Sequence, residues 1–270
     1  MLGKTSALVL CFLLSTLLLP LCRSSEEVDD EHEFDYLRES GRGPEYWGKI
    51  NPEWTACDHG EMQSPIDLLH KRVEVLPNLG RLRRKYKPTE AAVINRGHDI
   101  MVKWKEDPGY IVINGTKFNL KQCHWHSPSE HTFNGSRYML ELHMVHISVT
   151  GKIAAVGITY KYGRPDPFLA KLLPHIRVNE TAEVEVGIIN PKDIKIGSRK
   201  YFRYMGSLTI PPCTEGVIWT IVKKVRTASR EQVRALREAV DDGCEENARP
   251  IQPKEDRPVW FYTPTGIVAS

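Results

Sequence analysis

The stretch QCHWH at residues 122–126, together with LELHMVH at residues 140–146, decides how this chain folds. Apolar and polar residues alternate in both, and a period of two is typical of a β-strand because successive side chains point to opposite faces. His124 and His126 therefore lie on one face, about 6.5–7 Å apart along the backbone. Two imidazoles at that spacing can reach one metal ion.

The second stretch can supply a third imidazole. Its alternation separates two faces, one with Glu141, His143 and Val145, the other with Leu140, Leu142, Met144 and His146. If the two strands are antiparallel neighbours, His143 lies close to His124 and His126. Three neutral imidazoles leave the charge of a zinc ion uncompensated and its fourth position open, which is typical of a catalytic zinc site. Gln122 and Glu141, each two residues before a candidate ligand, can orient the imidazoles.

Alternating or β-branched stretches recur along the chain, so we expect a strand-dominated protein. The predicted strands are 91–95, 100–105, 110–114, 117–125, 138–149, 153–161, 201–209 and 217–225. Helical periodicity is convincing mainly at Ser229–Val240, where Ser229 can cap the first turn. No repeat and no low-complexity linker follows residue 45, which favours a single domain.

Composition and charge exclude several classes of protein. Of the 270 residues, 41% are hydrophobic and 26% are charged, which rules out collagen-like, wholly disordered and multi-span membrane chains. The formal net charge is only +3, and the basic run Arg81–Lys85 has no aromatic or glycine-rich nucleic-acid motif beside it. We therefore expect no nucleic-acid partner and interpret this run as a solvated surface.

The N-terminal region predicts secretion. Residues 1–25 contain an apolar run that ends in small polar residues, as in a cleaved signal peptide, and the run is too short for a membrane anchor. Residues 26–42 are acidic and predict a flexible arm, which leaves residues 43–270 as the main domain. The expected destination is the extracellular space, reached through the secretory pathway. The sequence does not fix the oligomeric state.

Cysteines and glycosylation sequons fit the same route. Four cysteines remain after residue 25, namely Cys57, Cys123, Cys213 and Cys244. In an oxidising compartment at least one disulfide is expected. Three sequons, at Asn114, Asn134 and Asn179, are candidate glycosylation sites.

Several separated motifs carry a resemblance to a known family. In chain order they are Gly43-Pro-Glu-Tyr-Trp47, Gln63-Ser-Pro-Ile-Asp67, Asn95-Arg-Gly-His98, Gln122-Cys-His-Trp-His126, Ser129-Glu-His-Thr132, Glu141-Leu-His143, Gly206-Ser-Leu-Thr-Ile-Pro-Pro212 and Asn247-Ala-Arg-Pro250. With them the chain resembles the alpha-type carbonic anhydrases over residues 34–264, and in particular their secreted plant branch.

The resemblance implies a fold and an activity. The fold is mainly β, a single domain around a twisted, mostly antiparallel central sheet of about ten strands with peripheral helices. The activity is the zinc-dependent, reversible hydration of carbon dioxide to bicarbonate and a proton by attack of zinc-bound hydroxide. Residues 43–270 would form the catalytic domain, and carbon dioxide and bicarbonate would be its small-molecule partners.

The resemblance also assigns roles to individual residues. His124, His126 and His143 match the zinc ligands, and Gln122 and Glu141 match the groups that orient them. The other catalytic matches are Thr209, which would donate its hydroxyl proton to Glu130, the proton shuttle His98, and Tyr36 and Asn95 along a chain of water. The apolar substrate pocket matches Val145, Ala155, Leu208, Val217 and Trp219, and the family disulfide matches Cys57 and Cys213.

Two departures and two alternative functions remain beside this interpretation. Ile210 stands where the family often has a hydroxyl or imidazole, and Arg96 stands where it often has a neutral amide. One alternative is a storage or defence protein with the same fold and little activity. The other is a different zinc hydrolase, which would need a carboxylate base close to the metal water, whereas Glu130 is better placed to orient Thr209.

Overall fold

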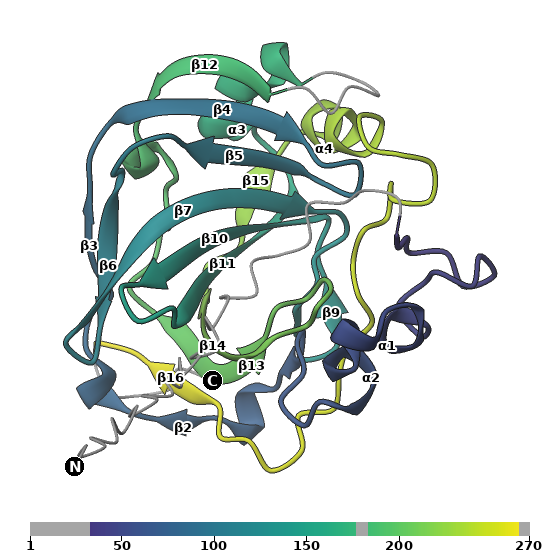
Figure 1. Ribbon diagram of the computed structural model, residues 1–270. Helices are drawn as coiled ribbons and strands as arrows, with labels where there is room; N and C mark the ends of the chain where they lie inside the picture. The colour runs from purple at the N-terminus through teal and green to yellow at the C-terminus, as the bar shows by residue number, and fades with distance from the viewer. Residues whose placement is uncertain (1–32, 177–182, 265–270) are drawn as a thin grey trace, which may run out of the picture.

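The computed structural model describes residues 33–176 and 183–264, and one large twisted sheet forms its centre (Figure 1). Within these residues the sheet has 13 strands, ten of which follow one another in the order β12-β4-β5-β7-β10-β11-β14-β13-β16-β2. Most neighbours are antiparallel, while β11 pairs in parallel with β14 and β15, and β16 with β2. The expected mainly β architecture with a mostly antiparallel central sheet is confirmed.

The strands at the centre of the sheet are the long alternating stretches of the sequence. They are β4 (Thr89–Asn95), β5 (Ile100–Trp104), β7 (Thr116–His126), β10 (Leu140–Ser148), β11 (Ile153–Tyr162), β13 (Tyr201–Ser207) and β14 (Glu215–Val222). With β6 (Gly109–Ile113), which pairs with β7, they correspond to the eight predicted strands. Alternation was sufficient to predict these eight strands because each of them buries at least one face.

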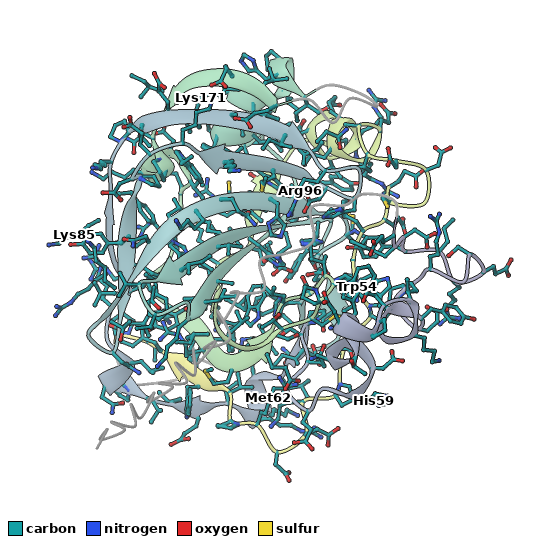
Figure 2. The ribbon with its side chains drawn as sticks, in the orientation of Figure 1. Trp54, His59, Met62, Lys85, Arg96 and Lys171 are labelled. Atoms are coloured by element: carbon teal, nitrogen blue, oxygen red, sulfur yellow. A yellow bond between two sulfur atoms is a disulfide. The ribbon has the colours of Figure 1, made fainter. Side chains whose placement is uncertain are left out.

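The remaining strands are shorter or lie at edges of the sheet. In the large sheet these are β2 (Glu74–Val75), β3 (Arg83–Tyr86), β12 (Glu183–Ile189), β15 (Arg226–Ala228) and β16 (Trp260–Tyr262). A separate small sheet contains β1 (Asp67–Leu68), β8 (Thr132–Phe133) and β9 (Ser136–Arg137). The basic run at residues 81–85 therefore overlaps β3, and Figure 2 shows Lys85 at the outer edge of the sheet. Basic side chains on an edge strand also discourage pairing with another chain.

In the described part of the chain, four short α-helices lie around the sheet (Figure 1), namely α1 (Trp47–Ile50), α2 (Ala56–His59), α3 (Pro167–Leu172) and α4 (Arg230–Arg237). The predicted helix at Ser229–Val240 is confirmed as α4, and it ends earlier than the periodicity suggested. Ser229 caps it, since its hydroxyl accepts from the backbone N of Gln232 at 3.2 Å and the Gln232 side chain accepts from the Ser229 backbone N at 3.1 Å. This reciprocal capping box satisfies two backbone donors at the start of the helix.

The two faces of β10 pack into different hydrophobic cores, as its alternation predicted. Leu140, Leu142 and Met144 belong to the larger core, which α3 and α4 also contact. Val145 belongs to a second core on the opposite face. The histidines that share a face with Val145 are thereby separated from the larger core.

The first described residues are packed rather than extended into solvent. Phe34 and Asp35 are buried, and the ring of Phe34 lies 5.3 Å from that of Trp47. The Asp35 backbone N donates to the Arg42 carbonyl at 3.0 Å, and the Tyr36 backbone N to the Gly243 carbonyl at 3.2 Å. The described part of the predicted arm, residues 33–42, is thus anchored by its aromatic residues despite its acidic composition, and the packed body begins at Phe34. Residues 1–32, including the predicted signal peptide, lie outside the described residues.

Candidate metal centre

Three histidines from two neighbouring strands converge at one point. β7 carries His124 and His126, β10 is its antiparallel neighbour, and His143 pairs directly with His124. The ring centroids lie 5.0 Å apart for His124 and His126, 5.2 Å for His124 and His143, and 4.6 Å for His126 and His143. One ligand nitrogen from each ring lies within 4.8 Å of the others, and all three side chains are buried. The predicted three-imidazole cluster is present.

Each imidazole is held by a hydrogen bond at the nitrogen that points away from the cluster. His124 Nδ1 lies 2.9 Å from Gln122 Oε1, and His143 Nε2 lies 3.0 Å from Glu141 Oε1. His126 Nδ1 donates to the backbone carbonyl of Asn247 at 2.7 Å, a partner that sequence reasoning did not identify. Such contacts fix the tautomer and the ring orientation of metal ligands. They leave Nε2 of His126 and Nδ1 of His143 directed toward the cluster.

The site favours neutral imidazoles beside an ionised carboxylate. Burial lowers the pKa of His124 and of His143, which keeps both rings in the form that can bind a metal. Burial alone would raise the pKa of Glu141, but His131 and His143 pair with its carboxylate and bring that pKa well below its usual range. The negative charge of Glu141 therefore lies directly behind the candidate ligand His143.

Glu141 is itself part of a buried network that the sequence did not reveal. Its Oε2 accepts from the His131 backbone N at 2.8 Å, and its Oε1 lies 2.8 Å from His131 Nδ1. His131 Nε2 lies 2.7 Å from the Tyr204 hydroxyl, which lies 2.8 Å from Ser64 Oγ. His131 occurs in one of the quoted motifs, but its partners Glu141 and Tyr204 are 10 and 73 residues away, and no local pattern indicates them.

Gly157 of β11 makes room for this carboxylate. It pairs with His143 in the sheet, and a Cβ atom at Gly157 would lie 2.8 Å from Glu141 Oε1 and 2.6 Å from Ile221 Cδ1. Real Cβ atoms essentially never approach other heavy atoms that closely. A glycine is therefore required at this point of β11 for Glu141 to reach His143.

The residues predicted to form an apolar pocket are brought together beside the histidines. Val145, Ala155 and Trp219 are successive neighbours across β10, β11 and β14. All five predicted residues, Val145, Ala155, Leu208, Val217 and Trp219, belong to one hydrophobic cluster and are buried. The Trp219 ring lies 4.7 Å from the His143 ring, so this cluster adjoins the candidate metal site directly.

Glu130 faces the cluster, but its expected hydrogen bond to Thr209 is not formed. Glu130 Oε1 accepts from the Arg249 backbone N at 3.0 Å. Oε2 lies 3.7 Å from His126 Nε2 and 3.9 Å from His143 Nδ1, and it has no hydrogen-bond partner among the described residues. Thr209 is buried. The structure leaves an acceptor available on Glu130, although the Thr209 hydroxyl does not occupy it.

His98 lies on a turn between β4 and β5 and is buried. Its ring lies 5.0 Å from that of Phe34, and neither ring nitrogen has a hydrogen-bond partner among the described residues. Burial lowers the pKa of His98 from 6.5 to about 3, although Asp99, whose Oδ2 lies 3.8 Å from His98 Nε2, opposes this effect. Arg96 forms a buried two-point ion pair with Asp99, at 2.8 and 2.6 Å. Arg96 thus neutralises the carboxylate nearest to His98.

Tyr36 and Asn95 both lie near this turn, but their side chains differ in hydrogen bonding. The Tyr36 hydroxyl is buried without a hydrogen-bond partner among the described residues, and burial raises the pKa of Tyr36 well above 10. Asn95 is a structural part of the turn, since its Nδ2 donates to the Ala239 carbonyl at 2.6 Å and its Oδ1 accepts from the Gly97 backbone N at 2.9 Å.

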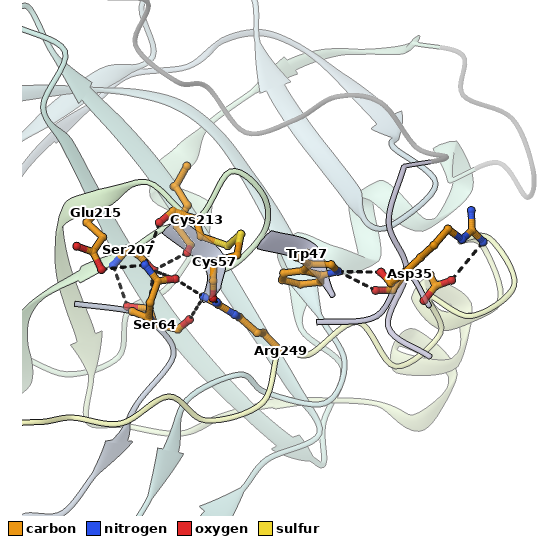
Figure 3. The surroundings of a disulfide bond; sticks show 11 residues. Asp35, Trp47, Cys57, Ser64, Ser207, Cys213, Glu215 and Arg249 are labelled. Carbon is orange, nitrogen blue, oxygen red and sulfur yellow. Dashed lines mark hydrogen bonds and ion pairs between the residues drawn. A yellow bond between two sulfur atoms is a disulfide. The ribbon is translucent and has the colours of Figure 1, made fainter. Parts of the chain in front are cut away.

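The disulfide implied by the resemblance is present between Cys57 and Cys213 (Figure 3). It joins the segment around α2 to the loop that follows Thr209, and the buried Arg249 side chain lies beside it and donates to the Cys57 carbonyl at 2.8 Å. Cys123 and Cys244 are unbridged and buried. The placement of Cys123 in the larger core agrees with its predicted strand face.

Two of the three predicted glycosylation sequons can be located. Asn114 and Asn134 are exposed and adopt positive φ angles of 47° and 50°, as asparagines in turns often do. Asn179 lies outside the described residues. The described chain contains no helix that is both long enough and apolar enough to cross a membrane.

Comparison with known proteins agrees with this geometry. The model of the eukaryotic-type carbonic anhydrase family matches residues 42–263. Alpha carbonic anhydrase 4 of Arabidopsis thaliana is 55% identical over 244 residues, which cover 90% of this chain and 91% of the relative.

Two solved structures have the same fold. Dioscorin in complex with ascorbate superposes with a TM-score of 0.83 at 44% identity, covering 85% of this chain and 98% of dioscorin. The alpha-carbonic anhydrase of Thermovibrio ammonificans in complex with sulfanilamide gives 0.78 at 36% identity, covering 84% and 98%. The family model matches most of the chain, and the histidine cluster is in place. The chain therefore belongs to the eukaryotic-type, or alpha, carbonic anhydrases.

Proposed function

We propose that this protein is an active, zinc-dependent carbonic anhydrase that interconverts carbon dioxide with bicarbonate and a proton. The observation that carries the proposal is the cluster of three buried imidazoles, each oriented from behind by a hydrogen-bond acceptor. A set of three neutral nitrogen donors suits zinc and leaves one position open for water.

The residues around the cluster fit the chemistry of this reaction. When bound, zinc supplies hydroxide near neutral pH by lowering the pKa of its water from 15.7 to about 7, an effect for which carbonic anhydrase is the standard example. His124, His126 and His143 would hold the ion, while Gln122 and Glu141 keep two of the rings in place. Carbon dioxide carries no charge, and the apolar cluster with Val145 and Trp219 offers it a site beside His143.

Glu130 and Thr209 would orient the attacking oxygen. An ionised carboxylate can only accept hydrogen bonds, so a Thr209 hydroxyl that donates to Glu130 Oε2 must itself accept from the nucleophile. The unpartnered Oε2 is the acceptor available for this contact. Formation of that hydrogen bond is part of the proposal.

His98 would carry the released proton to solvent. An imidazole with a pKa near 6.5 is suited to proton transfer at neutral pH, whereas the buried ring has a pKa of about 3 and stays neutral. The role therefore requires a side-chain rotamer of His98 in which the ring meets water. Tyr36 and Asn95 would border the water chain between His98 and the metal.

A storage or defence role with little activity is the second candidate function. It is favoured by the likeness to dioscorin, at 44% identity and a TM-score of 0.83. The intact histidine cluster argues for the enzyme, because a storage protein has no need of three oriented metal ligands. The different zinc hydrolase would use the unpartnered Oε2 of Glu130 as its base, and no observation favours that use over the orientation of Thr209.

We also propose that the protein is secreted, glycosylated and active outside the cytosol. The apolar segment at residues 1–25, the Cys57–Cys213 disulfide and the exposed Asn114 and Asn134 support this proposal. The apoplast is the expected destination, with a vacuole or a plastid as alternatives.

Metal analysis of the purified chain tests the metal site. We expect one zinc per chain, and loss of zinc together with loss of carbon dioxide hydration when His124, His126 or His143 is replaced by alanine, because two imidazoles seldom hold zinc in a catalytic geometry. His146→Gln serves as the matched control, since His146 lies on the opposite face of β10 with its ring nitrogens bonded to Tyr86 and Ala154. An unchanged zinc content in all three alanine variants would refute the site.

A further inference from the structure

Asn247 lies outside any helix or strand, yet its backbone and side chain both form hydrogen bonds with the site. It is 4% exposed, and its backbone carbonyl accepts from His126 Nδ1 at 2.7 Å. It is also joined to Ser127, because its backbone N donates to the Ser127 carbonyl at 3.1 Å and its Oδ1 accepts from the Ser127 backbone N at 2.7 Å. Asn247 is therefore fixed to the end of β7, directly beside a candidate metal ligand.

The side-chain amide of Asn247 reaches a second part of the site. Its Nδ2 donates to the His98 carbonyl at 2.8 Å and to the Trp125 carbonyl at 3.2 Å. One amide group thus bridges the turn that carries His98 and the strand that carries His124 and His126. No other described hydrogen bond of a side chain joins the His98 backbone to β7.

The same segment after α4 holds the turn at two further points. The Asp241 backbone N donates to the Gly97 carbonyl at 2.8 Å, and Asn95 Nδ2 donates to the Ala239 carbonyl at 2.6 Å. Figure 1 shows this segment running from α4 past the ends of the central strands. Asn247, at its far end, donates hydrogen bonds both to the turn and to the metal-ligand strand.

We propose that Asn247 is a positioning residue that sets the distance between His98 and the metal centre. Its backbone carbonyl orients His126, and its side chain, separately, holds the turn that carries His98. The Asn247 side chain therefore governs proton transfer to His98 and has little influence on metal retention. This inference rests on the proposed function of His98 and of the histidine cluster.

Asn247→Asp tests the proposal with minimal change of shape. The variant keeps an oxygen toward the Ser127 backbone N but replaces the donor with an oxygen that faces the carbonyls of His98 and Trp125. We expect net hydration in weak buffer to fall about tenfold, while carbon dioxide/bicarbonate exchange at equilibrium stays within about threefold of wild type. Added imidazole buffer should restore hydration, because a dissolved base replaces the mispositioned His98. Equal losses of exchange and hydration without buffer rescue would overturn the proposal.

A double-mutant cycle identifies the residue through which Asn247 acts. In a His98→Ala background, Asn247→Asp should cause no further loss of hydration, since the group it positions is gone. A further tenfold loss in that background would show that Asn247 acts elsewhere. Asn190→Asp is the matched control, because Asn190 also accepts a backbone hydrogen bond, from Lys192 at 3.0 Å, but lies outside the site. Asn247→Ala takes the place of Asn247→Asp if the charged variant does not fold.

Two further measurements do not depend on activity. Hydrogen–deuterium exchange of the peptide containing residues 95–99 should rise about tenfold in Asn247→Asp, while zinc release to a chelator changes less than threefold. Gln122→Ala should show the reverse, since Gln122 Oε1 lies 2.9 Å from Nδ1 of the candidate metal ligand His124. Unchanged exchange at residues 95–99 would refute the bridging role. If the wild-type protein holds zinc but does not hydrate carbon dioxide, the proposed function fails, and these two readouts still decide the role of Asn247.

Discussion

The five histidines between residues 124 and 146 differ in what their ring nitrogens contact. His124, His126 and His143 each have one nitrogen bonded to an orienting acceptor and converge on one point. His146 instead uses both nitrogens in the core, since its Nε2 lies 2.8 Å from the Tyr86 hydroxyl and its Nδ1 lies 3.2 Å from the Ala154 carbonyl. The fifth, His131, hydrogen-bonds through its Nδ1 to the carboxylate of Glu141. Whether a histidine belongs to the metal site therefore depends on the partners of its ring nitrogens and not on the number of histidines nearby.

His146 should make the folded state sensitive to mild acid. Burial lowers its pKa from 6.5 to about 4, so below pH 6.5 the unfolded state binds more protons than the folded state. The contribution is fully present above pH 6.5 and is lost as the pH falls toward 4. Between pH 7 and pH 5 it should cost about 2 kcal/mol of unfolding free energy, at 1.36 kcal/mol per pH unit below 6.5.

Urea denaturation of wild type and of His146→Gln at pH 7 and pH 5 isolates this effect. The other buried histidines are common to both proteins, so the difference between the two pH responses belongs to His146. We expect the variant to lose about 2 kcal/mol less on acidification. Identical losses in both proteins would show that His146 does not titrate in this way.

Sequence patterns predicted some of these residues and missed others for a physical reason. Strand alternation identified His124, His126 and His143 because all three lie on two strands, and within-strand spacing also pointed to Gln122 and Glu141. Asn247 and Tyr204 were missed as partners, because their contacts with His126 and His131 come from segments far away in the sequence. The Thr209 hydrogen bond, expected from the resemblance, depends on a hydroxyl orientation that no sequence pattern specifies.

Among the elements, the pair β7 and β10 determines the site. Their antiparallel register places His143 opposite His124, and it shifts between Val145 and His146. The shift leaves Lys121 as an extra residue of β7, a bulge of the kind that often re-aims side chains next to active sites. The eight predicted strands are all in the central sheet. β3 was missed because its sequence, Arg-Arg-Lys-Tyr, has no apolar alternation. β12 was missed although Val184, Val186 and Ile188 alternate with Glu183, Glu185 and Gly187.

β11 offers a test of the carboxylate behind His143. Gly157→Ala should weaken zinc binding about 10–100-fold, because the added methyl displaces Glu141 from His143 while all three ligands remain. Gly163→Ala is the matched control, since a Cβ there would approach Thr227 Cγ2 at 2.8 Å and crowd the structure without touching a carboxylate. Chelator competition measures both affinities. Equal zinc affinities in the two variants would contradict the role assigned to Glu141.

For the molecule as a whole, the Cys57–Cys213 disulfide closes a long covalent loop. The two cysteines are 156 residues apart in sequence, so the crosslink restricts the unfolded chain strongly and should contribute about 5 kcal/mol of stability in the chain-entropy model. We expect reductant to lower the urea midpoint of the wild type and to leave that of Cys57→Ala/Cys213→Ala unchanged. Cys244→Ala, which removes a buried thiol without a crosslink, controls for local packing. An unchanged urea midpoint of the wild type in reductant would show that the disulfide does not stabilise the folded state.

We propose that the protein is a working zinc enzyme rather than an inactive relative with the same fold. Stopped-flow carbon dioxide hydration by the purified mature protein tests it most directly, measured as isolated, after zinc removal with a chelator, and after zinc is restored. We expect hydration well above the uncatalysed rate, loss of that rate when zinc is removed, and recovery with one equivalent of zinc per chain. Hydration no faster than the uncatalysed reaction in a folded chain that holds one zinc would contradict it and would favour the storage or defence role.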